Sequence, residues 1–220
     1  MWSASITVLN PGFEDNVLSD GSSGPVPASW SGGGIAWNPT TTQYPGEAPE
    51  GQNVAAINIG NLWQAITGSS ITAGLTYILE VDVGYRLDVA TTPNYTVELR
   101  ASGPSGTLLV SKDQSDVTPS KSVFSTLTLS FTAPTGAAYL GQTLAIKMTS
   151  AGVQTNFDNV RLSAVPLPAA LPLFSGGLAL LGWRRPSDTA RVVPLPAISS
   201  CAHTVAPGLS GRSPARRSSL

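Results

Sequence analysis

Charged residues are scarce in this sequence of 220 residues. They make up 11% of the chain, against roughly 25% in an average soluble domain. Helices on a protein surface need many Glu, Lys and Arg residues, so the shortage argues against a mainly helical fold. Thr, Ser, Val and Gly are plentiful instead, which is typical of a β-sheet protein with a hydroxyl-rich surface.

Histidine and cysteine are almost absent. The single histidine, His203, and the single cysteine, Cys201, both lie near the C-terminus. No disulfide can therefore form within the chain. Residues 1–163 cannot contain a Ser-His-Asp or Cys-His catalytic group, nor a zinc site that uses histidine or cysteine ligands.

Charge divides the chain into two parts. Residues 1–163 carry six basic and twelve acidic side chains, a balance of −6, whereas residues 164–220 carry six arginines and one aspartate, a balance of +5. Nucleic-acid binding needs a basic face, so the acidic first part argues against a nucleic-acid partner.

A period of two dominates the first part of the chain. Apolar and polar residues alternate in segments 76–85, 94–100, 126–132 and 144–149, as they do in strands with one buried face. Turn signals separate these segments from shorter candidate strands at 6–9, 35–37, 54–59, 108–111 and 160–163. About nine short strands without connecting helices predict an all-β, antiparallel sandwich or barrel over residues 1–163.

The character of the chain changes after residue 164. Residues 165–183 carry no charge, and the apolar stretch 169–183 ends at Arg184 and Arg185. A helix that spans a membrane needs ~17–25 apolar residues, so we expect a short membrane or sorting helix here. A buried core helix is the alternative. Residues 186–220 are rich in Pro, Ser, Ala and Arg, which predicts a disordered tail.

The segment around residue 165 resembles the PEP-CTERM sorting signal of bacterial proteins processed by an exosortase. The resemblance rests on Val165, Pro166, Leu167 and Pro168, the apolar stretch after them, and the pair Arg184 and Arg185. It implies export to the cell envelope or beyond, transient anchoring in the inner membrane by residues 169–183, and an exosortase-type enzyme as partner. Residues 1–4 lack a signal peptide, so we expect the true start to lie upstream.

Residues 6–163 resemble jelly-roll carbohydrate-binding modules with a galactose-binding-like fold. The resemblance rests on residues 8–14 (VLNPGFE) and 156–162 (NFDNVRL). It implies a structural calcium ion bound by Glu14, Asp158 and backbone carbonyls, which are the oxygen ligands that calcium prefers. Asp158 shares strand parity with Val160 and Leu162, so we expect it to point inward. The alternative is that Asp158 accepts backbone N–H bonds and Glu14 is a surface residue.

Sugar binding needs exposed aromatic faces and polar partners. Trp37, Tyr44 and Trp63 lie near predicted loops or strand ends, and Arg86 is a candidate polar partner. The alternative is that the aromatic residues belong to the core.

These observations predict an exported protein, without catalytic activity, that binds extracellular polysaccharide. One alternative is a structural matrix or adhesion protein without a small ligand. Another is a polysaccharide-active enzyme that uses two of the carboxylates Glu80, Asp82 and Glu98.

Overall fold

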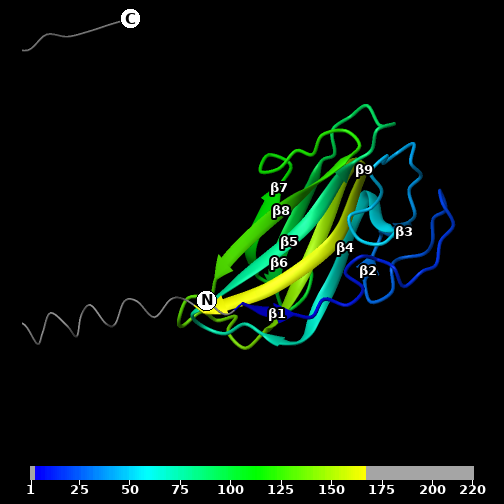
Figure 1. The fold of residues 1–220 in the computed structure, drawn as a ribbon. Helices are drawn as coiled ribbons and strands as arrows, with labels where there is room; N and C mark the ends of the chain where they lie inside the picture. The colour runs from blue at the N-terminus through cyan, green and yellow to red at the C-terminus, as the bar shows by residue number, and fades with distance from the viewer. Residues whose placement is uncertain (1–2, 167–220) are drawn as a thin grey trace, which may run out of the picture. The chain divides into compact units, whose positions relative to one another are not determined.

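The computed structural model describes residues 3–166, which form nine strands and no helix. All pairings between these strands are antiparallel (Figure 1), so the prediction of an all-β antiparallel fold is confirmed. The strands are β1 (Ala4–Ile6), β2 (Ser31–Gly32), β3 (Ile35–Trp37), β4 (Val54–Ser70), β5 (Leu75–Tyr85), β6 (Tyr95–Ala101), β7 (Leu108–Asp113), β8 (Val123–Thr132) and β9 (Thr143–Pro166).

The predicted sorting helix and tail lie outside the described residues, as do Leu167, Pro168, Arg184 and Arg185 of the predicted sorting signal. Within residues 3–166, no helix has the length and apolar character needed to cross a membrane.

Two long strands connect the two layers of the fold. The first half of β9 pairs with β6, and its second half pairs with β5. Strand β4 pairs with the first half of β9 and with residues 155–157 at the start of its second half, with register shifts between Ile57 and Ile59 and between Ala65 and Ser70. In Figure 1, β9 (yellow) runs along almost the whole domain. The sequence predicted shorter strands here, at residues 54–59, 144–149 and 160–163.

The core lies between these layers. Strands β5 and β6 follow the predicted alternation, with Leu79, Val81 and Val97 fully buried. Tyr95 of β6 and Phe157 of β9 meet edge to face at 5.9 Å between ring centroids. The two layers therefore share one continuous hydrophobic cluster.

A β-bulge in β9 changes the direction of Asp158. Glu80 pairs with Arg161 and Asp82 pairs with Asp158, so one residue of β5 faces two residues of β9. Asn159, in the bulge, has a left-handed φ of 50°, which asparagine tolerates better than most residues. The expectation that Asp158 points inward with Val160 is wrong: the bulge reverses the parity and places Asp158 on the outer face with Asp82.

The N-terminal segment is attached to β4 through the side chain of Gln64. The backbone N–H of Leu9 donates to Oε1 of Gln64 at 2.9 Å, and Nε2 of Gln64 donates to the carbonyl of Leu9 at 2.8 Å. Gln64 is 4% exposed. Its amide therefore satisfies both backbone groups of Leu9 as a neighbouring strand would.

We expect Gln64→Ala to lower the free energy of unfolding by about 2 kcal/mol, because it leaves two backbone groups without partners. Urea unfolding of both proteins measures the difference. Thr128→Ala, at an exposed position of β8, is the control and should change stability by less than about 0.5 kcal/mol. Equal effects of the two substitutions would contradict this role for Gln64.

Candidate functional site

A second, smaller hydrophobic cluster covers part of the outer face of the sheet. It contains Trp37, Tyr44, Val54 and Ala56, with Phe124 of β8 packed against it. The Tyr44 hydroxyl donates to Oδ1 of the buried Asn156 at 2.9 Å. Burial raises the pKa of Tyr44 well above its usual range, so its phenol stays neutral.

Gly84 of β5 makes this packing possible. A Cβ atom at Gly84 would lie 2.5 Å from the ring of Phe124 and 2.7 Å from the hydroxyl of Tyr44. These distances are shorter than any van der Waals contact, so a side chain at this position would displace the aromatic cluster.

Three of the four predicted sugar-binding residues come together, but two of them are buried. The guanidinium of Arg86 lies 4.8 Å from the ring centroid of Trp37. It is held by both carboxylate oxygens of Asp88, at 2.9 and 2.5 Å, and by Gln154 at 2.6 Å. Trp37 is 8% exposed and Tyr44 is 1% exposed, so neither offers an open face for stacking. Trp63 lies on β4 opposite Ser31, apart from this cluster.

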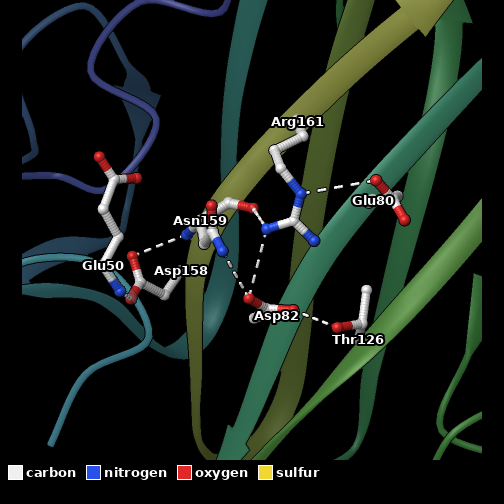
Figure 2. A network of polar contacts seen from close by, with 7 residues as sticks. All are labelled: Glu50, Glu80, Asp82, Thr126, Asp158, Asn159 and Arg161. Carbon is white, nitrogen blue, oxygen red and sulfur yellow. Dashed lines mark hydrogen bonds and ion pairs between the residues drawn. The ribbon is translucent and has the colours of Figure 1, made fainter.

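Asp158 is fully buried on this same outer face. It accepts hydrogen bonds from the backbone N–H groups of Glu50 at 2.9 Å and Asn159 at 2.7 Å (Figure 2). Burial raises the pKa of Asp158 to about 8, and the negative charges of Glu50 and Glu14 act in the same direction. A carboxyl group in this environment holds its proton at neutral pH unless a cation compensates the charge.

Glu14 reaches the same loop from the N-terminal segment. Its Oε1 accepts hydrogen bonds from the backbone N–H groups of Gln52 at 2.8 Å and Asn53 at 2.6 Å. Its carboxyl group also packs against Gly51, where a Cβ atom would lie 2.4 Å from Cδ of Glu14. The fold therefore brings the two predicted calcium ligands, Glu14 and Asp158, to one loop at residues 50–53.

The donor set at this loop fits calcium better than it fits a transition metal. No group of three or more His, Cys, Asp or Glu side chains within residues 3–166 is placed to hold a metal, so two carboxylates would need carbonyl oxygens to complete a shell. Oδ1 of Asn53 is a buried acceptor without a partner in this part of the chain. Among residues 3–166, no salt bridge neutralises Glu14, Glu50 or Asp158. Oxygen ligands with uncompensated negative charge suit a hard cation such as calcium.

A polar network continues from the bulge across β5. Nδ2 of Asn159 donates to Asp82 at 2.9 Å, and the hydroxyl of Thr126 donates to the other oxygen of Asp82 at 2.5 Å. Arg161 lies 3.5 Å from both Asp82 and Glu80 (Figure 2). Asn159 thus contacts Asp158 through its backbone and Asp82 through its side chain.

Sequence reasoning missed Glu50 and Asn159, and it considered Asp82 as a candidate carboxylate of a polysaccharide-active enzyme, whereas Asp82 is 7% exposed and part of this network. The loop that covers these residues carries no motif that signals its position. The one available signal is Asn159 itself, because asparagine is enriched among residues with a left-handed φ.

A cavity of about 400 Å³ opens beside the aromatic cluster. Tyr44, which lines the cavity, donates a hydrogen bond to Asn156. Gly51 and Gln52 also line it, and both contact the carboxyl group of Glu14. The lining residues are Leu18, Ser19, Asp20, Asn38, Pro39, Thr41, Tyr44, Glu47, Ala48, Gly51 and Gln52.

Comparison with known proteins identifies relatives of this domain. Residues 4–163 match the sequence profile of a family described as HpiC1-like, HpiC1 cyclase. The Stig cyclase Fisc from Fischerella sp. TAU, in complex with (3Z)-3-(1-methyl-2-pyrrolidinylidene)-3H-indole, is 26% identical with a TM-score of 0.68. The match covers 76% of this chain and 100% of that one.

A cyclase from the same organism, in complex with 4-(1H-indol-3-yl)butan-2-one, is 26% identical over the same shares of both chains, with a TM-score of 0.66. An α-L-arabinofuranosidase is 14% identical, with a TM-score of 0.51, and the match covers 73% of this chain and 26% of that one. This last similarity shows a shared fold alone. Among curated proteins, no significant match was found.

These matches overturn several predictions from the sequence. The assignments to PEP-CTERM proteins and to carbohydrate-binding modules are wrong, because the family profile covers nearly all of the described chain. The expected partners, extracellular polysaccharide, an exosortase-type enzyme and the inner membrane, are also wrong, because the family is one of cyclases and two solved relatives are in complex with small indole compounds. The prediction of a protein without catalytic activity, whether a binding or a matrix protein, is also wrong, because the family is one of cyclases. Export stays a prediction, and so does the division of the chain into a domain at residues 1–163, a sorting segment at 164–185 and a tail at 186–220.

The residues that suggested a carbohydrate-binding module belong to the matched region, since segments 8–14 and 156–162 both lie within it. They carry Glu14, Asp158 and the bulge at Asn159, which together form the acidic side of the site. The profile match extends from Ala4 in β1 to Ser163 in β9. The chain belongs to the HpiC1-like cyclase family.

Proposed function

We propose that this chain is a cyclase that closes a ring in a small, indole-type organic molecule bound in the cavity beside Tyr44. The observation that carries the proposal is the match to Fisc, which covers that whole chain and includes a complex with an indole compound. The match spans the full length of that solved chain.

The cavity has the size and the composition that such a molecule needs. Its volume of about 400 Å³ lies within the range of ~300–1,000 Å³ that is usual for small-molecule sites. Tyr44, Leu18 and Pro39 offer aromatic and apolar surface. Ring closure by isomerisation forms a new σ bond from the electrons of a C=C π bond, while one proton is added at one atom and another is lost elsewhere, so the molecular formula is unchanged. The carboxyl groups of Asp20 and Glu47 line the cavity and can carry that proton.

We expect Ala48→Phe to fill the cavity and to weaken binding of 4-(1H-indol-3-yl)butan-2-one by about tenfold or more, without unfolding the protein. Isothermal titration calorimetry measures binding, and the unfolding midpoint checks the fold. Ala138→Phe, at an exposed site outside the cavity, is the matched control and should bind like the wild type.

Activity is tested by incubating the protein with indoles that carry alkenyl side chains. The expected product has the mass of its substrate but a different chromatographic retention, and Ala48→Phe should reduce its formation. If no indole in the panel binds and none is isomerised, the proposed function is wrong.

We further propose that the domain is a jelly roll stabilised by calcium, with Glu14 and Asp158 as side-chain ligands. The support is the convergence of Glu14, Glu50 and Asp158 on one loop without a basic partner among the described residues. Bound calcium would supply positive charge that allows Asp158 to ionise. The ion would join the N-terminal segment, the loop at 50–53 and β9, three parts of the chain that are distant in sequence.

The raised pKa of Asp158 predicts how stability depends on pH when calcium is chelated. Between about pH 4 and pH 8 the folded state holds a proton that the unfolded state releases, so stability should fall as pH rises. The slope approaches about 1.4 kcal/mol per pH unit within this window. We expect Asp158→Asn to flatten the dependence, as measured by urea unfolding at several pH values with chelator present.

Calcium should reverse this trend, because only the ionised carboxylate binds the metal. The unfolding midpoint of the wild type should rise on addition of calcium, more at pH 8 than at pH 5, and Asp158→Asn should not respond. Glu80→Gln, an acidic residue on the same face but outside the loop, is the control and should respond like the wild type. A wild-type midpoint that ignores calcium at both pH values would rule out the metal site.

A further inference from the structure

We infer that the cavity selects a ligand whose nitrogen is positively charged and donates hydrogen bonds, such as a protonated amine attached to an aromatic ring. The inference rests on the proposed function, in which this cavity holds the substrate, and it specifies the chemical class of that substrate. It follows from the charge of the lining, from an unused acceptor in the wall, and from the apolar surface beside them.

The lining of the cavity is charged with one sign. Among residues 3–166, Asp20 and Glu47 are the charged residues that line it, and no basic residue does. Residues 1–85 contain seven acidic residues and no lysine, arginine or histidine. Arg86 is the first basic residue of the chain, and both oxygens of Asp88 pair with it. A concave surface with charge of one sign concentrates ligands of the opposite sign.

Asn38 provides an acceptor that the protein itself does not use. Asn38 is 7% exposed. Its Nδ2 donates to the carbonyl of Leu18 at 2.9 Å, and its backbone carbonyl accepts from Gly21 at 2.9 Å. Within residues 3–166, no donor reaches its Oδ1, although the residue lines the cavity. Unlike Oδ1 of Asn53, this oxygen is accessible from the surface, so an N–H group of a ligand can donate a hydrogen bond to it.

The acceptors and the apolar surface are arranged for a molecule with two different ends. Asn38, Asp20 and Glu47 all offer oxygen acceptors, which suit a donor with several N–H groups such as an ammonium. Leu18 and Tyr44 offer surface for an aromatic ring. An anionic ligand would meet the same oxygens with repulsion.

The neighbouring carboxylates strengthen this preference even when calcium is bound. Gly51 separates the cavity from the carboxyl group of Glu14, which belongs to the group formed with Glu50 and Asp158. A divalent cation compensates two of these three charges when all are ionised, so the wall behind the cavity stays negative.

Three indoles with short side chains that differ in charge test the inference. Tryptamine carries an ammonium, tryptophol a neutral hydroxyl and indole-3-acetate a carboxylate. We expect tryptamine to bind about fivefold or more tightly than tryptophol, and indole-3-acetate to bind most weakly. Titration calorimetry with the full chain at neutral pH measures all three, and the advantage of tryptamine should shrink at high salt.

Variants separate local contacts from overall charge. Asp20→Asn combined with Glu47→Gln should abolish the preference for tryptamine, and Asn38→Leu should weaken tryptamine more than tryptophol. Glu80→Gln combined with Asp116→Asn removes the same charge outside the cavity and should keep the preference. If tryptophol or indole-3-acetate binds as tightly as tryptamine, the inference is overturned, while the cyclase proposal stands. If none of the three binds, the inference is overturned, and the incubation with alkenyl indoles decides the cyclase proposal separately.

Discussion

The structure of the site depends on one constraint, the burial of the Asp158 carboxyl group without a basic partner among residues 3–166. A buried carboxyl group must either keep its proton or receive compensating charge and hydrogen bonds. Here the backbone N–H groups of Glu50 and Asn159 supply hydrogen bonds. The loop that contains Glu50 is thereby held on the outer face of the sheet, where Glu14 attaches it a second time through Gln52 and Asn53.

This attachment explains why a sandwich with few charged residues has a cavity on its outer face. The segment that carries Glu47, Gly51 and Gln52 lines the cavity, and Tyr44 at its start packs on the sheet through Asn156. The carboxyl groups of Glu14 and Asp158 therefore hold one end of the loop at residues 44–53, and the aromatic cluster around Tyr44 holds the other end. The proposed ligand selection and the proposed cation binding are separate properties, but both would depend on the position of this loop.

The sequence predicted the strands better than it predicted the site. Alternation in β5 and β6 was visible because one face of each strand is fully buried, and Glu14 and Asp158 were identified through the motifs that contain them. The burial of Asp158 was predicted, but its direction was wrong because the bulge at Asn159 leaves no periodic signal. Glu50 could not be found, since its role depends on a backbone N–H group that every residue except proline has. Membership of a cyclase family was missed because the residues that line the proposed substrate cavity come from separate loops, and their spacing in the sequence matches no catalytic motif.

Hydrogen exchange of the backbone amides of Glu50, Gln52 and Asn53 tests this account most directly. These amides donate to Asp158 and Glu14, so their protection reports whether the carboxylates hold the loop. The account predicts strong protection in the wild type with calcium, and a selective loss in Asp158→Asn while the amides of β6 keep theirs. Equal protection of the loop in both proteins would show that the loop is held by other contacts and would contradict the account.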